Sequence, residues 1–497
     1  MQDASKAKAS SGIEGLDDIL SGGFARGSLF LIEGSPGTGK TTLALDYLLE
    51  GARTGESCLY ITLSETKAEL LAGAASHGWT VPANVELVEL QPPDSVLDPK
   101  QAQSLLYSSD LELGETVKMV FTATDRVRPS RIVIDSLSEI RLLAQDSLRY
   151  RRQLLAMKHY FARSSATVLA LDDLTADAND KTAHSIAHGV VRLEELTPEY
   201  GAERRRMRVV KYRGQVFRGG FHDFAIKTGG LEVYPRLVSS EHRKDRGVSI
   251  VSSGNSEMDK LLGGGLESGS STLILGPAGA GKSLLVFQFI AAACGRGEKA
   301  ALFAFDEELG LLFRRSKAMG IDLEALAKQG QLRVAQVDTA ELSPGEFAHR
   351  VRTQVGKNDA RIVAIDSING YQQAMPQENY LILHMHELLQ YLNRQGVSTF
   401  LTVAQHGLAG DMKTPVDVTY LADSVILLRF FEAEARVRRA MSVIKKRTGF
   451  HEDTIREFKI SNRGLSLGSP LTGFHGVLRG VPTYRGSGEP LLQNERS

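Results

Sequence analysis

G-S-P-G-T-G-K-T, from Gly34 to Thr41, and G-P-A-G-A-G-K-S, from Gly276 to Ser283, are the two stretches that decide the fold of this chain. Both match G-x-x-x-x-G-K-[ST], a glycine-rich loop whose backbone N–H groups surround phosphate oxygens. Each loop follows a short apolar run and precedes a helix-like segment, which is the strand–loop–helix context that the motif requires. Two matches in equivalent contexts argue against an ordinary glycine-rich turn. The sequence therefore predicts two phosphate-binding sites.

Each loop is expected to bind ATP together with Mg²⁺. The ammonium groups of Lys40 and Lys282 would add positive charge at the β- and γ-phosphates, so both lysines are also predicted to be catalytic. The hydroxyls of Thr41 and Ser283 are predicted Mg²⁺ ligands. The predicted ATP-binding residues are Gly34, Ser35, Pro36, Gly37, Thr38, Gly39, Lys40, Thr41 and Thr42 in the first copy, and Gly276, Pro277, Ala278, Gly279, Ala280, Gly281, Lys282, Ser283 and Leu284 in the second.

The repeat extends well beyond the two loops. The interval from Gly12 to Gly34 and the interval from Gly254 to Gly276 are both 22 residues, so the two copies are in register. A second apolar run, ending in acidic residues, follows each loop, and a third ends in aspartate, as R-I-V-I-D-S and R-I-V-A-I-D-S. This is the duplication of a whole domain and not a short solenoid repeat.

Length and composition indicate a duplicated α/β protein. A chain of 497 residues is too long for one core, and we predict a first domain at 1–240 and a second domain, with a C-terminal tail, at 241–497. Short Val/Ile/Leu runs alternate with amphipathic stretches, the pattern of α/β units around a mostly parallel sheet. The break is expected in the polar stretch 239–246, and the Gly-, Pro- and Ser-rich tail after Leu465 is expected to be poorly ordered or to act as a docking segment.

Composition excludes several classes of protein. Lys+Arg and Asp+Glu are both 59, so net charge gives no argument for a nucleic-acid or membrane partner. The two cysteines, Cys58 and Cys294, favour a reducing compartment without a disulfide framework. The N-terminal residues contain no apolar signal region, and no run of 18 apolar residues occurs. We therefore expect a cytoplasmic protein that does not span a membrane.

Acidic residues at predicted strand ends complete the two sites. Asp135 and Asp366 each follow a buried-looking strand and match the Walker B carboxylate that holds Mg²⁺. Glu65, Asp306 and Glu307 follow another strand, where RecA-type ATPases place the residue that polarises the attacking water. The alternative interpretations are turn residues at strand ends and solvated loop acids.

The chain resembles the KaiC family of circadian-clock ATPases and autokinases, within the RecA-like superfamily. The resemblance covers nearly the whole chain and is carried by the duplicated loops, the Asp306-Glu307 pair, the Walker B strands and the segment A-D-S-V-I-L-L-R-F-F…I-R-E-F, from Ala422 to Phe458. It implies tandem RecA-like P-loop domains, in which the first copy is a slow ATPase and the second adds a reversible Ser/Thr autokinase. It also implies a double-ring homo-hexamer with nucleotides between subunits. By this resemblance the residues that reach a neighbour's nucleotide are Lys211, Arg213, Lys445 and Arg447.

The phosphoacceptor follows from the same resemblance. The two family hydroxyl positions are occupied here by Thr419 and Tyr420, of which Tyr420 has a longer reach and a different acidity and is the poorer acceptor. Thr414 is a nearby third hydroxyl. The alternatives are a RecA-like DNA-handling ATPase and a nucleotide-gated scaffold that binds a signalling partner without kinase activity. The arginine-rich segment 204–208 resembles a nucleic-acid patch, but its place just before Lys211 favours a subunit contact or a solvated strand.

Overall fold

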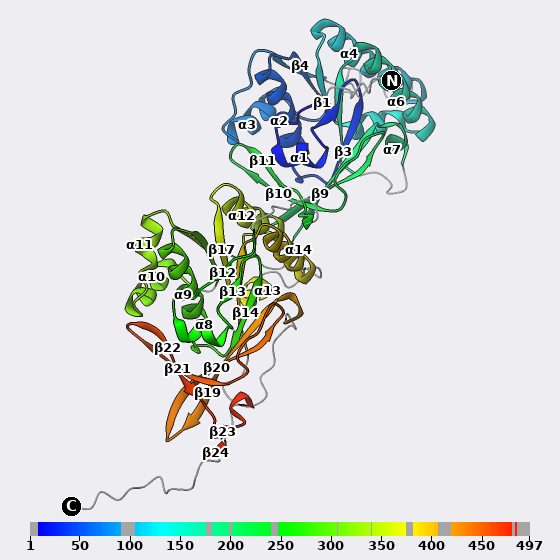
Figure 1. Cartoon of the computed structure of the whole chain (residues 1–497). Coiled ribbons are helices and arrows are strands. Elements are labelled where there is room, and N and C mark those ends of the chain that lie inside the picture. The colour runs from blue at the N-terminus through cyan, green and yellow to red at the C-terminus, as the bar shows by residue number, and fades with distance from the viewer. Residues whose placement is uncertain are drawn as a thin grey trace, which may run out of the picture. The chain divides into compact units, whose positions relative to one another are not determined.

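The computed structural model describes residues 8–90, 105–174, 181–197, 201–239, 247–305, 307–338, 340–373, 381–405, 419–479 and 483–484. The chain forms two compact units, Met1–Arg236 and Leu237–Ser497 (Figure 1). Each unit has a nine-stranded, mostly parallel sheet with helices on both faces, which confirms the predicted tandem α/β architecture. Of the stretch 239–246, where the sequence predicts the domain break, residues 240–246 lie outside the described residues.

The sheet of the first unit has the strand order β11-β10-β9-β8-β3-β7-β6-β4-β5. The strands from β8 to β5 in this order are parallel, whereas β9, β10 and β11 continue the sheet as an antiparallel meander. The central strands are buried on both faces, which explains their continuous apolar sequences. The strands are β1 (Lys8–Ala9), β2 (Phe24–Ala25), β3 (Leu29–Glu33), β4 (Cys58–Thr62), β5 (Val85–Glu89), β6 (Arg131–Asp135), β7 (Thr167–Asp172), β8 (Gly189–Leu196), β9 (Arg204–Tyr212), β10 (His222–Lys227) and β11 (Gly230–Tyr234).

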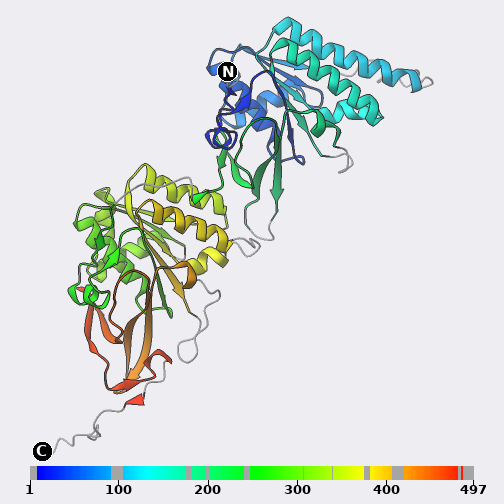
Figure 2. The ribbon, with the colours of Figure 1, turned by 45° about the vertical axis from the view of Figure 1, so that its right-hand side comes forward.

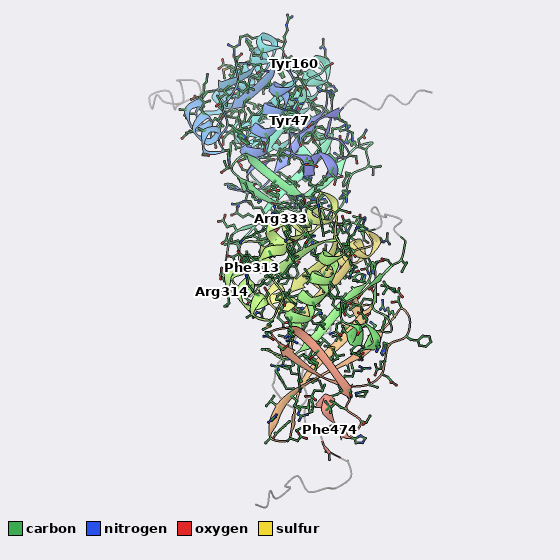
Figure 3. All side chains as sticks on the ribbon, turned by 60° about the vertical axis from the view of Figure 1, so that its left-hand side comes forward. Tyr47, Tyr160, Phe313, Arg314, Arg333 and Phe474 are labelled. Carbon is green, nitrogen blue, oxygen red and sulfur yellow. The ribbon has the colours of Figure 1, made fainter. Side chains whose placement is uncertain are left out.

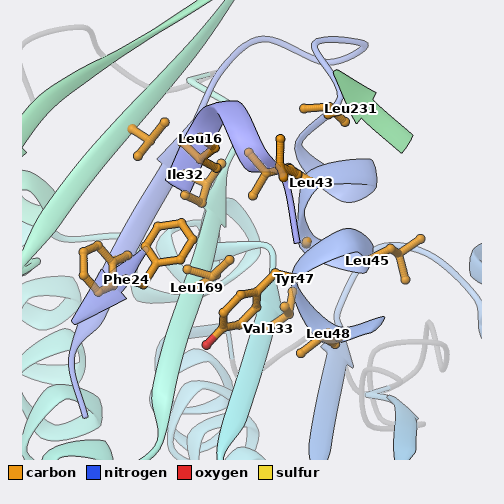
Figure 4. Close-up of a cluster of buried hydrophobic side chains, with 14 of the residues drawn as sticks. Leu16, Phe24, Ile32, Leu43, Leu45, Tyr47, Leu48, Val133, Leu169 and Leu231 are labelled. Atoms are coloured by element: carbon orange, nitrogen blue, oxygen red, sulfur yellow. The ribbon is translucent and has the colours of Figure 1, made fainter. Parts of the chain in front are cut away.

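Helices cover both faces of this sheet and create two core clusters. On one face Leu43 and Tyr47 of α2 pack with Val133 and Leu169 of the sheet (Figure 4). On the other face α4, α5 and α6 pack over the same strands, and Figure 2 shows the two long helices α4 and α6 lying side by side. The helices are α1 (Glu14–Ile19), α2 (Lys40–Arg53), α3 (Lys67–Ser76), α4 (Leu105–Val127), α5 (Leu137–Ala144), α6 (Ser147–Ser164) and α7 (Thr182–Ile186).

The sheet of the second unit repeats this topology in the order β16-β15-β17-β18-β14-β19-β20-β21-β22. The strands from β16 to β19 are parallel, and β20, β21 and β22 are antiparallel. The strands are β12 (Ile250–Val251), β13 (Leu266–Glu267), β14 (Ser271–Gly276), β15 (Lys299–Ala304), β16 (Leu332–Gln336), β17 (Ala360–Asp366), β18 (Ser398–Ala404), β19 (Ser424–Ala433), β20 (Arg436–Lys446), β21 (Arg456–Ser461), β22 (Gly464–Pro470), β23 (Phe474–His475) and β24 (Thr483–Tyr484).

The helices of the second unit also divide between two faces. Helices α9, α10 and α11 share a core cluster on one face, and α12, α13 and α14 share another on the opposite face. Among the helices in the described ranges of the whole chain, none is both long enough and apolar enough to cross a membrane. The helical segments are α8 (Ser256–Leu261), α9 (Lys282–Gly295), α10 (Leu309–Ala318), α11 (Leu323–Lys328), α12 (Pro344–Gly356), α13 (Ile368–Gln373), α14 (Leu381–Arg394), η4 (Thr419–Leu421) and η5 (Val477–Arg479).

The chain after Leu465 is more structured than its composition predicts. β22 pairs with β21 and closes the antiparallel edge of the sheet. Beyond it, Phe474 lies with its ring centroid 5.8 Å from that of Phe431 (Figure 3), and Val477 is buried in the same cluster. The expectation of a poorly ordered tail is therefore wrong as far as residue 479, because these apolar side chains pack on β19 and β20.

Candidate functional site

The two phosphate loops lie at the carboxyl ends of β3 and β14, and each leads directly into a helix. Gly39 and Gly281 precede α2 and α9 with φ of 92° and 107°, a conformation that L side chains rarely adopt. A Cβ on Gly39 would lie 2.7 Å from Ile226 Cδ1, and one on Gly281 would lie 2.9 Å from Ile460 Cδ1. The antiparallel strands therefore pack against the loops, and only glycine fits. The N-terminus of each helix presents backbone N–H groups where an anion can bind.

Both loop lysines fold back onto their own loops. Lys40 Nζ donates to the carbonyl oxygens of Gly34 at 2.9 Å and Ser35 at 3.0 Å, and it forms an ion pair with Asp173 Oδ1 at 2.8 Å. Lys282 Nζ donates to the carbonyl oxygens of Gly276 at 3.0 Å and Pro277 at 2.9 Å. Both lysine side chains are buried. Each ammonium group is thus held by the carbonyl oxygens of the first two residues of its loop.

In the first copy the carboxylate of Asp135 lies at the end of β6 beside the loop. Its Oδ2 accepts hydrogen bonds from Thr41 Oγ1 at 3.4 Å and from the Tyr60 hydroxyl at 2.5 Å. Burial raises the pKa of Asp135, although the hydrogen bond from Tyr60 opposes this shift. The structure thus brings the predicted residues Thr41 and Asp135 together, and it adds Tyr60, which was not predicted as part of the site.

Glu65 lines a cavity of about 400 Å³ beside the same loop, and Thr41, Thr42 and His77 also line it. Burial is the first cause that raises the pKa of Glu65, and the charge of Asp135 adds to the shift. A carboxyl group with a raised pKa next to the loop has the character expected of a base that accepts a proton from water. Thr42 and His77 contact each other, with 3.5 Å between Oγ1 and Nε2.

In the second copy Asp366 ends β17 in the position equivalent to Asp135. It accepts a hydrogen bond from the hydroxyl of Thr402. Burial lowers the pKa of Lys282, and the negative charge of Asp366 opposes this shift, so the two groups are electrostatically coupled. Burial raises the pKa of Glu307, while its ion pair with Arg315, at 2.6 Å between Oε2 and Nη2, acts in the opposite direction. Asp306 lies outside the described residues.

The four cations predicted to reach a neighbour's nucleotide contact carbonyl groups of their own chain. Lys211 Nζ donates to the carbonyl oxygens of His184 and Ala187, and Arg213 Nη2 donates to that of Ser185 at 2.6 Å. These carbonyls belong to α7 and the residue that follows it. The cations thus bind the carbonyl end of a short helix, where the helix dipole favours positive charge.

The second copy repeats this arrangement at η4. Lys445 Nζ donates to the carbonyl oxygens of Thr419 at 3.1 Å and Ala422 at 2.7 Å. Arg447 donates to the carbonyl oxygen of Tyr420 and forms an ion pair with Asp423, both at 3.4 Å. The structure thus brings the predicted cations and the predicted phosphoacceptors together. The side chain of Tyr420 is exposed and that of Thr419 is half-buried. Thr414 lies outside the described residues.

The arginine-rich stretch on β9 is engaged within the sheet. Arg206 Nε lies 2.9 Å from a carboxylate oxygen of Glu194, and Arg205 Nη2 lies 2.9 Å from one of Glu195. These partners lie on β8, directly opposite in the antiparallel register. Cross-strand ion pairs therefore account for much of the charge that resembles a nucleic-acid patch in the sequence.

One acid at the first site was missed by sequence reasoning. Asp173 follows β7, which lies between β3 and β6 in the sheet, and it contacts Lys40. The signal was available, because T-V-L-A-L-D-D, from Thr167 to Asp173, is another apolar run ending in acids. It has the same form as the Walker B runs, but no copy of it exists in the second half, where β18 ends in T-V-A.

Comparison with known proteins decides the family. The family model described as "ATPase: KaiC" matches residues 9–238 and again residues 251–471. The chain belongs to the KaiC family of ATPases. It is 27% identical over 484 residues to the "Circadian clock oscillator protein KaiC" of Parathermosynechococcus lividus, covering 96% of this chain and 88% of that protein. It is 26% identical over 492 residues to the "Circadian clock protein KaiC3" of a Synechocystis species, covering 97% of this chain and 96% of that protein.

The match to the KaiC family confirms the resemblance drawn from the sequence, including the RecA-like class of both domains. Since the family model matches each half separately, the chain contains two copies of this ATPase domain. The chain is accordingly an ATP-binding protein of the KaiC ATPase family.

Proposed function

We propose that this KaiC-family protein hydrolyses Mg²⁺·ATP in both copies and that its second copy also phosphorylates the chain itself on threonine, in nucleotide-dependent signalling or timing. The observation that carries the ATPase part is the repeated phosphate loop, in which a buried lysine is held on loop carbonyls and an aspartate ends β6 or β17 of the same sheet. The experiment that tests the whole proposal incubates the purified protein with ATP and Mg²⁺, measures phosphate release, and locates phosphorylated residues by mass spectrometry.

The residues present fit a magnesium ion. Mg²⁺ in nucleotide sites is held by one or two carboxylates, a hydroxyl and substrate phosphates, so a large protein cage is not needed. Thr41 Oγ1 lies 3.4 Å from Asp135 Oδ2, and this hydroxyl–carboxylate pair is the donor set that the first copy would use. Ser283 and Asp366 would serve the second copy. When bound, the ion would neutralise charge on the β- and γ-phosphate oxygens.

Hydrolysis in the first copy is then assigned to three groups. The loop N–H groups and Lys40 bind the phosphates, and Lys40 stabilises the negative charge of the transferring phosphoryl group. Glu65 orients the attacking water and accepts its proton, for which its raised pKa makes it a better base. The bond between the γ-phosphorus and the bridging oxygen breaks, and ADP and phosphate leave. Glu307 takes the role of Glu65 in the second copy.

The autokinase part rests on the contacts of η4. Lys445 and Arg447 hold the backbone of Thr419 and Tyr420, so a hydroxyl and two cations that stabilise phosphoryl transfer lie in one cluster. In the proposed step the Thr419 hydroxyl oxygen bonds to the γ-phosphorus of ATP held by a neighbouring subunit. Its proton passes to a carboxylate of that site, and ADP leaves.

Assembly into a hexamer is expected, because Lys211, Arg213, Lys445 and Arg447 can act on phosphates only if they face a neighbour's nucleotide. Light scattering at micromolar protein with ATP and Mg²⁺ should give about six times the monomer mass of 54.1 kDa. The double variant Lys40→Ala, Lys282→Ala is the matched control and should assemble less completely, since nucleotide lies between subunits. A monomer that retains full ATPase activity would contradict the role of these cations across a subunit boundary.

Arg447→Ala is expected to lower turnover at the second site by about 100-fold with a change in ATP affinity of less than about threefold. A cation that acts on the transferring phosphoryl group stabilises mainly the transition state. The measurement compares kcat and nucleotide Kd in a Lys40→Ala background, so that only the second copy contributes. Arg436→Ala, which removes an exposed arginine at the start of β20, the strand that Arg447 follows, is the control. Equal losses in binding and turnover would mean that Arg447 serves ground-state binding instead.

A further inference from the structure

The two loop lysines differ in one contact. A lysine ammonium has three donors, and those of Lys40 face two loop carbonyls and Asp173. Among the described residues, Lys282 Nζ has the two equivalent loop carbonyls and no carboxylate within ion-pair distance. In the first copy, therefore, the carboxylate of Asp173 forms an ion pair with the lysine that is proposed to bind phosphate.

The position of Asp173 explains the difference. In the first sheet Asp172 on β7 is the backbone partner of Glu33 on β3, so the next residue, Asp173, lies opposite Gly34. In the second sheet the residue opposite the first loop glycine, Gly276, is Ala404. Alanine carries no group that can reach an ammonium. The asymmetry is thus a property of two side chains at equivalent places at the carboxyl ends of β7 and β18, and it does not require a different backbone.

Asp173 is also well placed to compete with a phosphate. Its side chain is 31% exposed, against 7% for Lys40, so it lies on the open side of the pair, where it can move. Its other carboxylate oxygen, Oδ2, lies 3.4 Å from Ser136 Oγ, directly after Asp135. A triphosphate that binds Lys40 must displace this carboxylate, and the displaced charge then stays near the phosphate oxygens and repels them.

We propose that Asp173 is a competing anion that lowers the affinity of the first copy for ATP and sets it below that of the second. This inference rests on the proposed ATPase function of the first copy. Asp173 acts twice in the same direction, first by occupying Lys40 and then by like-charge repulsion of the bound phosphates. The first copy would consequently release nucleotide faster than the second, and its site would lose its nucleotide at a higher ATP concentration.

The test measures nucleotide affinity at one site at a time. In a Lys282→Ala background, calorimetric titration with a non-hydrolysable ATP analogue and Mg²⁺ reports the first copy. Asp173→Asn, which keeps the size and removes the charge, should bind the analogue about tenfold more tightly than the parent. Glu14→Gln, an exposed acid on α1, changes net charge equally and should leave affinity unchanged. A gain in affinity is a readout that damage to the fold does not produce.

The reciprocal variant keeps the inference falsifiable. In a Lys40→Ala background, Ala404→Asp should weaken binding at the second copy by about tenfold. Unchanged or weaker binding in Asp173→Asn would overturn the competing-anion role, provided that the Lys282→Ala parent binds the analogue. If neither that parent nor Asp173→Asn binds it at all, the proposed function of the first copy fails instead. Unchanged affinity in Ala404→Asp would equally count against the competition.

Discussion

Replacing both loop lysines, Lys40→Ala with Lys282→Ala, is expected to lower ATP hydrolysis at least about 100-fold. Each loop contains a single cation, and its ammonium is buried and held on the carbonyls of that loop, so no other residue of the loop can supply the charge. Positive charge beside the transferring phosphoryl group is the main means of catalysis in phosphate loops. Each single variant should keep the activity of the other copy. The measurement is phosphate release per protomer with Mg²⁺ present.

The controls are Lys118→Ala and Lys317→Ala, which remove one exposed lysine from each unit and should leave turnover unchanged. The single variants also divide the total activity between the two copies. If each keeps a fraction and the fractions sum to the parent rate, the copies work independently. Parent-level turnover in the double variant would show that hydrolysis takes place elsewhere.

The fold and the loops could be predicted because their signals are local. A glycine pattern, a lysine and a short apolar run lie within a few residues of each other, and duplication presents every signal twice. The same logic failed where contacts are long-range. The Gly, Pro and Ser residues of 465–479 suggested poor order, yet Phe474 in this segment packs on Phe431 from β19. Tertiary packing supplies that stability, and composition does not encode it.

Two arginines that align in the sequence also show that local sequence does not determine long-range contacts. Arg131 and Arg361 begin the matching runs R-I-V-I-D-S and R-I-V-A-I-D-S. Arg131 is buried and pairs with Glu56 at 2.9 Å, whereas the side chain of Arg361 is 39% exposed. The extra alanine in the second run shifts the register between β15 and β17 at this point, so the two arginines are not structural equivalents. One inserted residue moves a side chain out of the core.

For the site residues, the sequence predicted positions at strand ends but not all of the partners that these residues contact. Strand-end position placed Asp135 beside Thr41, but it could not show that Asp173 takes a donor of Lys40. Nor could it show that the Lys-x-Arg pairs bind helix carbonyls of their own chain. These contacts join segments about 25 to 130 residues apart, and their partners are backbone oxygens or a single acid. No local pattern marks such partners.

Thr419→Ala is expected to remove at least about nine-tenths of the phosphate that the protein incorporates from ATP, while first-copy hydrolysis stays near the parent rate. Thr419 presents an aliphatic hydroxyl within η4, and Lys445 Nζ contacts its carbonyl oxygen at 3.1 Å. The measurement is incorporation of labelled phosphate, followed by mass spectrometry of the modified peptides. Tyr420→Phe is the matched control, because it removes the neighbouring hydroxyl and should keep most incorporation.

A phosphate on Thr419 would also rearrange its surroundings. It adds about −1.5 to −2 charges next to Lys445 and Arg447, which here bind neutral carbonyls and Asp423. A dianion is a stronger partner than a carbonyl oxygen, so the phosphate on Thr419 should draw these cations away from the carbonyls they now contact and from a neighbour's nucleotide. Phosphorylation would then lower the rate of phosphoryl transfer at the second copy, and Thr419→Glu should turn over ATP more slowly there than Thr419→Ala.

Unchanged phosphate incorporation in Thr419→Ala would exclude Thr419 as the acceptor. A parent protein that hydrolyses ATP without incorporating phosphate would instead leave a nucleotide-gated scaffold, whose Lys445 and Arg447 stabilise η4 and nothing more.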